Sequence, residues 1–232
     1  MDEFPAPILH EDAQLIAVAK PDGLAAVPER DLAVDCLWRR LEAARGERLW
    51  AVHRLDKEVS GLILFARNAA AHRALSLAFE RRETVKTYVA LLQGVLAGES
   101  GTVDAPIAQF GSGRMGVRAD GKPSRSDWTV RERTPRHSLV ELRPLTGRRH
   151  QLRVHCYHLG HPIAGDSRYG DPALQRATPR LMLHAWTLRL PHPGGGELAL
   201  EAPWPDSFRA VVNGLVTPDG PTLARSSPES PP

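Results

Sequence analysis

The chain has 232 residues, 42% hydrophobic and 25% charged, which is ordinary for a globular protein that buries a sizeable core. The net charge of +3 is too modest to identify a partner by itself, and two cysteines exclude a disulfide framework. No apolar run approaches the roughly 18 residues of a membrane span, and the acidic start lacks a secretory pattern, so we expect a cytoplasmic protein without membrane contact.

The first third of the chain alternates between strand and helix patterns. Residues 13–20 are apolar and predict a strand that ends at the turn Pro21–Gly23. Residues 33–45 predict a helix, because four apolar side chains share one helical face: Val34, Leu37, Trp38 and Leu41. Residues 61–67 form an apolar run and predict a buried strand.

A capped helix and a longer strand follow. Asn68 is a suitable N-cap for a helix that extends to Arg82 with Leu75, Ala78 and Phe79 facing inward. Residues 84–93 alternate as a strand, which places Tyr88 on an ordered element. Residues 101–145 resemble short antiparallel strands between Gly and Pro turns.

The last part of the chain contains one more helix pattern and two strands. Residues 148–159 predict a helix with Leu152, Cys156 and Leu159 on the buried side, so that Arg153 lies beside the buried stripe. Residues 181–190 and 197–202 predict strands separated by a glycine turn.

These elements predict an α+β fold, because the helices are too few for a doubly wound sheet. We expect residues 1–12 to be an N-terminal extension and residues 13–215 to be one domain. Residues 216–232 are rich in Pro and Ser and predict a disordered tail.

The segment from His53 to Gly61 carries the strongest chemical signal. It places Asp56 between Arg54 and Lys57, immediately before the apolar run. Nearby positive charge favours an ionised carboxylate, which a nucleophile or a base requires. An ordinary Arg-x-Asp turn with a surface ion pair is far more common, so the surrounding sequence must decide.

Four motifs in one order resemble the RluA-type pseudouridine synthase family, across about residues 13–202. His-Arg-Leu-Asp followed by Ser-Gly resembles the family's catalytic motif, although Val59 stands where the family usually has threonine. The other three matches are the Lys-Pro-x-Gly-Leu signature at 20–24, Lys-x-Tyr at 86–88, and the block from Leu145 to His155 that continues through Gly160–Asp166. Four motifs in register are much stronger than one.

The resemblance implies a pseudouridine synthase fold, which is a mixed, mostly antiparallel sheet bent around a central cleft with flanking helices. It also implies an enzyme that converts uridine in RNA to pseudouridine without a metal or other cofactor. Asp56 would act at the ribose, and Arg153 would form an ion pair with it. Tyr88 would stack on the uracil and help to remove the C5 proton, whereas its residue pattern alone is also typical of a half-buried strand aromatic.

Other residues are expected to bind the substrate. Arg54 and His53 would fill the stack left by an extruded nucleotide. Lys20 and Arg148 are phosphate candidates, and His150 belongs to the basic cluster around Arg148, Arg149 and Arg153. Arginine outnumbers lysine strongly in this chain, which suits phosphate and base contacts but equally follows from codon bias in a GC-rich genome.

A histidine cluster suggests zinc at first sight, but its spacing does not fit. His150, His155, His158 and His161 would point to different sides of a helix, and there is no Cys-x-x-Cys or His-Glu-x-x-His motif. We therefore expect no metal site there.

Two other classes of function remain as alternatives. Asp56 and Glu58 could form the carboxylate pair of a glycosidase or nucleosidase, and the chain could be a non-catalytic RNA-binding module. The early position of Lys20 leaves no room for an S4 RNA-binding domain, which favours a small folded target such as a tRNA stem-loop or a ribosomal RNA hairpin. We expect a monomer that binds RNA and not DNA.

Overall fold

The computed structural model describes residues 6–28 and 35–215. Within these residues, ten strands form one mixed sheet whose main order is β1-β2-β4-β11-β5-β10-β9-β6, with β12 beside β11 and β3 beside β4. The pairs are antiparallel except β4 with β11. The strands are β1 (Ile8–Glu11), β2 (Leu15–Lys20), β3 (Trp50–Ala51), β4 (Ser60–Ala66), β5 (Val85–Gln93), β6 (Ser100–Asp104), β9 (Arg125–Arg133), β10 (His137–Pro144), β11 (Leu183–Pro191) and β12 (Glu197–Glu201).

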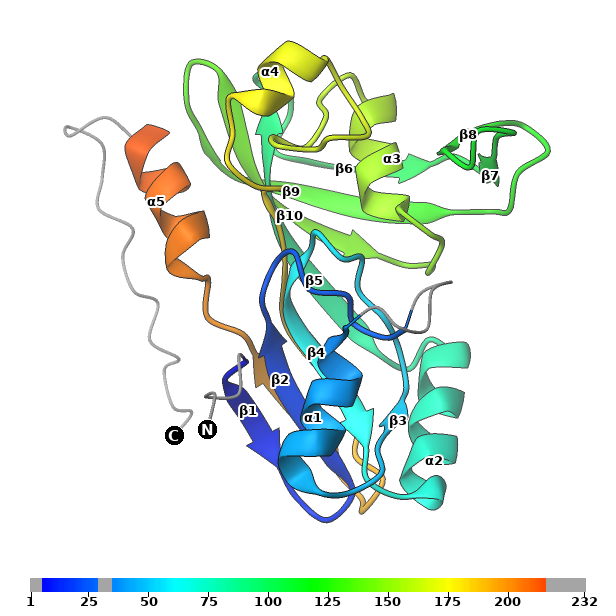
Figure 1. Ribbon diagram of the computed structural model, residues 1–232. Helices are drawn as coiled ribbons and strands as arrows, with labels where there is room; N and C mark the ends of the chain where they lie inside the picture. The colour runs from blue at the N-terminus through cyan, green and yellow to red at the C-terminus, as the bar shows by residue number, and fades with distance from the viewer. Residues whose placement is uncertain (1–5, 29–34, 216–232) are drawn as a thin grey trace, which may run out of the picture.

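The expected α+β class and mostly antiparallel sheet are confirmed. The boundary of the expected N-terminal extension at residue 12 is corrected, because β1 pairs with β2 and forms an edge of the sheet. Between 101 and 145 the strands β9 and β10 are longer than expected, with nine and eight residues. A separate hairpin of β7 (Ile107–Gln109) and β8 (Met115–Val117) projects from this half of the molecule (Figure 1).

Helices flank both the lower and the upper part of the sheet in Figure 1. In the lower part of the view are α1 (Leu37–Arg45) and α2 (Ala69–Glu80), and in the upper part are α3 (Gln151–His158) and α4 (Pro172–Arg176). The last helix, α5 (Asp206–Leu215), and the short α4 have no counterpart among the predicted elements. No helix in the described part of the chain combines the length and the apolar character needed to cross a bilayer.

The predicted helix boundaries shift for local reasons. Asn68 caps α2 as expected, since its side chain accepts a hydrogen bond from the backbone N–H of Ala71 at 2.8 Å. The helix stops before Arg82, whose φ of 60° is left-handed. The third predicted helix starts at residue 151 because His150 has a φ of 56°. Val34 and residues 216–232, which carry the tail prediction, lie outside the described residues.

The strand that follows the Asp56 motif is buried along its whole length. Alternate residues of β4 face two clusters: Ile63 and Phe65 enter one, and Leu62 and Leu64 enter the other. A strand covered on both faces is continuously apolar, as the sequence is here. At its start, a side chain on Gly61 would overlap the backbone of Ala185 in β11, so the motif's glycine permits the close approach of these two strands.

Candidate active site

Asp56 lies in the loop between β3 and β4, and backbone bonds fix this loop. Val59 N–H donates to the Asp56 carbonyl at 3.1 Å. The carbonyl of Lys57 accepts from Gly23 N–H at 2.9 Å and from Lys20 Nζ at 3.0 Å. The loop is therefore held although Val59 lacks the hydroxyl of the threonine that is usual in the family. The Asp56 side chain remains 22% exposed toward the cleft.

The structure corrects the phosphate-contact prediction for Lys20. Its Nζ donates to the carbonyls of Pro21, Leu24 and Lys57 at 2.7, 2.7 and 3.0 Å, and the residue is 1% exposed. Burial lowers the pKa of Lys20 to about 8. Its ammonium group holds the loop that carries Asp56 and is not available to RNA.

Arg153, on α3, forms the expected ion pair with Asp56, but most of its guanidinium is engaged elsewhere. Nη1 lies 3.2 Å from Asp56 Oδ2 and 3.4 Å from Glu58 Oε2. Nε and Nη2 each donate to Asp166 at 2.8 Å. Burial opposes the charge, yet the hydrogen bonds and charge of Asp166, with the charge of Asp56, raise the pKa of Arg153 above its usual value.

His150 lies beside the same carboxylate. Its Nε2 is 3.9 Å from Asp56 Oδ2, and its Nδ1 is hydrogen-bonded to the hydroxyl of Tyr169 at 2.9 Å. Burial lowers the pKa of His150, although Asp56 opposes this shift. The φ of His150 is 56°, which is a strained backbone conformation for a non-glycine residue, so the surrounding contacts must hold it. The predicted substrate-binding residue thus lies next to the candidate catalytic group.

Tyr88 is half-buried on β5 and lines the cleft with Asp56 and Arg153. Burial raises the pKa of its hydroxyl well above the usual range, and the negative charge of Asp56 raises it further. Tyr88 is therefore a neutral hydroxyl at physiological pH.

His53 and Arg54 differ in their surroundings. The ring of His53 stacks on Phe79 with centroids 4.8 Å apart, and its Nε2 accepts a hydrogen bond from Leu64 N–H at 3.1 Å. Burial lowers the pKa of His53 to about 3, with a further contribution from Lys86. His53 is thus a neutral ring in the lining of the cleft, and its role beside an extruded nucleotide stays a prediction. Arg54 is exposed, as its predicted role requires.

One cleft of about 1660 Å³ is lined by His53, Arg54, Asp56, Tyr88, His150 and Arg153. Its described lining carries seven arginines and one lysine against two carboxylates, a charge balance suited to a polyanion. Arg148 belongs to this lining, although its Nε also donates to the Pro123 carbonyl at 3.3 Å. The cations are Arg54, Arg82, Lys86, Arg143, Arg148, Arg149, Arg153 and Arg168, and the carboxylates are Asp56 and Glu80.

The histidines considered for zinc have separate partners. Nδ1 and Nε2 of His155 contact Ser126 Oγ and the Ala105 carbonyl at 2.9 and 3.1 Å. His161 Nδ1 contacts the Gln93 carbonyl at 2.9 Å. The expectation that this cluster binds no metal stays a prediction.

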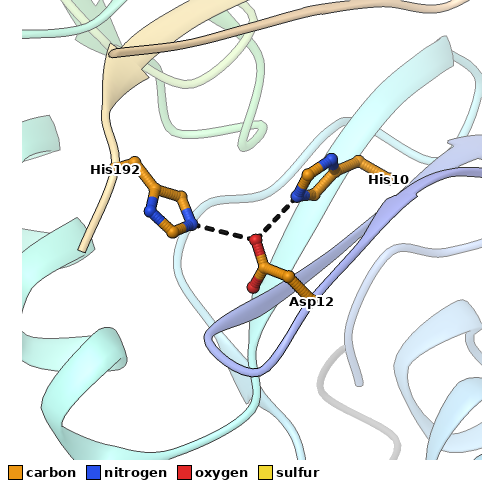
Figure 2. Close-up of side chains that lie close together, drawn as sticks. All are labelled: His10, Asp12 and His192. Atoms are coloured by element: carbon orange, nitrogen blue, oxygen red, sulfur yellow. Dashed lines mark hydrogen bonds and ion pairs between the residues drawn. The ribbon is translucent and has the colours of Figure 1, made fainter. Parts of the chain in front are cut away.

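A different cluster, which sequence reasoning missed, joins the β1–β2 turn to the β11–β12 hairpin (Figure 2). Nε2 of His10 and Nε2 of His192 lie 2.7 and 2.9 Å from the same oxygen, Asp12 Oδ2. Gly194 N–H donates to His192 Nδ1, so the proton of this ring is on Nε2 and faces Asp12. A metal would need a lone pair there, and the arrangement is therefore a hydrogen-bonded clasp.

Sequence reasoning also missed Asp166 as a partner of Arg153. The available signal was its place in the last motif, which ends with Gly165 and Asp166. Glu58 was weighed as half of a catalytic carboxylate pair. In the structure, Glu58 and Asp56 share Nη1 of Arg153.

Comparisons with known proteins agree with this geometry. A family model described as RNA pseudouridylate synthase matches residues 14–158. The chain is 37% identical over 229 residues to ribosomal large subunit pseudouridine synthase D of Nitrosomonas europaea, with 92% of this chain and 66% of the relative covered. It is 39% identical over 220 residues to ribosomal large subunit pseudouridine synthase C of Yersinia pestis, with 90% and 68% covered.

Two solved human structures have the same fold. RNA Pseudouridylate Synthase Domain Containing 1 superposes with a TM-score of 0.74 at 28% identity, covering 96% of this chain and 99% of that one. RNA Pseudouridylate Synthase Domain Containing 4 has a TM-score of 0.74 at 29% identity, covering 90% and 92%. The chain spans about two thirds of the length of the curated relatives. It belongs to the RNA pseudouridylate synthase family.

Proposed function

We propose that this chain is an RNA pseudouridine synthase that acts on large-subunit ribosomal RNA. The observation that carries the proposal is Asp56, which is held by Arg153 within a basic cleft that also contains Tyr88. The names of the curated relatives support ribosomal RNA as the substrate. The proposal also includes that the protein is cytoplasmic, that it is a monomer, and that it acts on RNA and not on DNA.

The reaction breaks the N1–C1′ bond of uridine and forms a C5–C1′ bond. C5 loses a proton and N1 gains one, so the conversion is an isomerisation without oxidation or reduction. Asp56 would act at the ribose, either by attacking C1′ or by removing a ribose proton. Arg153 keeps Asp56 oriented, and the cations around the cleft hold the RNA backbone.

Tyr88 has a defined place in this scheme. Its ring would stack on the detached uracil. Because its hydroxyl is neutral, it can accept the C5 proton only while passing its own proton on, and Asp56 is the nearby base. Arg54, exposed at the cleft, would occupy the space left by the extruded nucleotide.

The experiment is to incubate the purified protein with large-subunit ribosomal RNA and, separately, with bulk tRNA, both from a strain that lacks this gene. Sites of pseudouridine are then mapped by chemical modification and primer extension. New pseudouridine in the ribosomal RNA supports the proposal. Modification of tRNA alone would reassign the substrate, and no pseudouridine in either RNA would reject the activity.

A further inference from the structure

We propose that Asp166 is a positioning residue, which orients Arg153 so that Nη1 faces Asp56. This inference rests on the proposed function for its catalytic consequence. Its structural part concerns the contact between two buried side chains, and it can be tested without turnover.

The contact between Arg153 and Asp166 has the geometry of a two-point clamp. Nε and Nη2 donate to Oδ2 and Oδ1 of Asp166, both at 2.8 Å, which fixes the plane of the guanidinium. The side chains of Arg153 and Asp166 are 1% and 0% exposed, so the phosphate of a bound RNA does not reach this contact. With the plane fixed, Nη1 points to the oxygen of Asp56 at 3.2 Å.

Asp166 is itself held rigidly in the loop between α3 and α4. Its N–H donates to Gln175 Oε1 at 3.0 Å, while its Oδ1 also accepts from the backbone N–H groups of Arg168 and Tyr169 at 2.9 and 3.3 Å. Gln175 Nε2 donates to the Tyr169 carbonyl at 2.8 Å. The same Tyr169 binds His150, so this loop supports two neighbours of Asp56.

Charge gives Asp166 a second role. Arg153 faces three carboxylates, those of Asp166, Asp56 and Glu58. If Asp166 were neutral, Nε and Nη2 of Arg153 would lose their charged partner. The guanidinium could then move away from Asp56, or it could rotate and bind Asp56 through two nitrogens. Either a loosened or a doubly bonded Asp56 would be misplaced for the reaction, and misplacement by about 1 Å costs on the order of 10²-fold in rate.

The test compares Asp166→Asn with Asp171→Asn. Asp171 lies in the same loop and is exposed. It is the N-cap of α4, because its Oδ1 accepts hydrogen bonds from the N–H groups of Ala173 and Leu174. We expect Asp166→Asn to lower kcat by roughly 10²-fold with unchanged KM and RNA affinity. Asp171→Asn should behave as wild type. Retention of more than half of the wild-type kcat by folded Asp166→Asn would overturn the proposal.

A double-mutant cycle shows whether Asp166 acts through Arg153. In an Arg153→Met background, adding Asp166→Asn should lower kcat no further, since there is no guanidinium to orient. An equal loss in both backgrounds would refute the role. If Asp166→Asn does not fold, Asp166→Glu keeps the charge but shifts the carboxylate by one methylene. A folded Asp166→Glu enzyme with wild-type kcat would also overturn the proposal.

A readout without turnover separates this inference from the proposed activity. In nuclear magnetic resonance, the Arg153 Nε–H proton should exchange slowly with solvent in wild type and rapidly in Asp166→Asn. If the wild type forms no pseudouridine but this proton is protected, the activity fails and the clamp stands. If the proton is unprotected in wild type, the clamp itself is wrong.

Discussion

Arg153 directs Nη1 toward Asp56 at 3.2 Å while its two other nitrogens bind Asp166 at 2.8 Å. The arginine is therefore a bridge between a buried carboxylate and one that faces the cleft. Substitutions at its two ends should have different consequences, because one end serves the reaction and the other holds the bridge in place.

Asp56→Asn should abolish isomerisation, with less than a tenth of wild-type turnover, and leave RNA affinity nearly unchanged. The cations of the cleft remain, and removing one negative charge does not weaken binding to a polyanion. Turnover on radiolabelled RNA and filter binding measure the two properties on one preparation. Turnover above a tenth of the wild-type value would show that Asp56 is not the catalytic carboxylate.

Arg153→Met should be nearly inactive, with a small residual kcat that is still measurable, and it should also lower the free energy of unfolding by about 3–5 kcal/mol, because it leaves the Asp166 carboxylate buried without its partner. Adding Asp166→Asn should recover much of that stability without restoring activity. Urea unfolding of the two variants provides the comparison. A double variant no more stable than Arg153→Met would contradict this account of the pair.

Tyr88→Phe should slow product formation by roughly 10²-fold or more, the usual contribution of general acid–base catalysis. Phenylalanine keeps the ring for stacking but cannot relay the C5 proton. Release of tritium from RNA labelled at uridine C5 reports this step. The matched control is Tyr157→Phe, since Tyr157 is an exposed tyrosine of α3. A wild-type rate for Tyr88→Phe would leave stacking as its role.

Arg149→Gln and Lys20→Met should differ in the salt dependence of RNA binding. Arg149 is exposed at the cleft, and loss of one phosphate contact should reduce the slope of log K against log salt by about 0.7–0.9. Lys20→Met should lower stability, because three carbonyls lose their donor, and leave the slope unchanged. A reduced slope in folded Lys20→Met would restore its predicted phosphate contact.

The free energy of unfolding should decrease as the pH falls below neutral, because the buried ring of His184 must take up a proton. Its ring is buried, with Nδ1 bonded to Ser60 Oγ and Nε2 to the Ala202 carbonyl, and burial lowers its pKa to about 4 from 6.5. The unfolded chain binds more protons between these values, so the stabilisation is complete above 6.5 and is lost as the pH falls toward 4. At pH 5 the loss would be up to about 2 kcal/mol.

The measurement for His184 is urea unfolding at pH 7 and pH 5. The decrease should be smaller in His184→Gln than in wild type, and it should be retained in His158→Gln, where an exposed histidine is replaced. Equal decreases in wild type and His184→Gln would show that other groups cause the pH dependence.

Sequence patterns predicted the elements whose periodicity is set by burial. The apolar run of β4 and the capped amphipathic helix α2 are examples, as both signals are local. The helix α5 was missed, although its signal is equally local, because Phe208 and Val212 are one helical turn apart and both are buried. What the sequence could not show is the partner of this face, which includes the distant residue His184.

Motifs located the residues of the site but not their partners. Asp56, Tyr88 and Arg153 meet at the cleft as expected. The sequence shows that Lys20 is a cation, but not that three carbonyls surround its ammonium group. The sequence alone does not pair Asp166 with Arg153, since the two lie 13 positions apart, across helix and loop.

The position of β11 bears on when the enzyme becomes competent during its synthesis. Asp56 precedes β4 and Tyr88 lies on β5, yet in the sheet these two strands are joined through β11, which begins at Leu183. A nascent chain that has emerged only as far as Arg153 contains every proposed catalytic side chain but lacks the strand that sets their spacing. Completion of the active site is thus deferred until late in translation, when β11 has been synthesised and can pair with both β4 and β5.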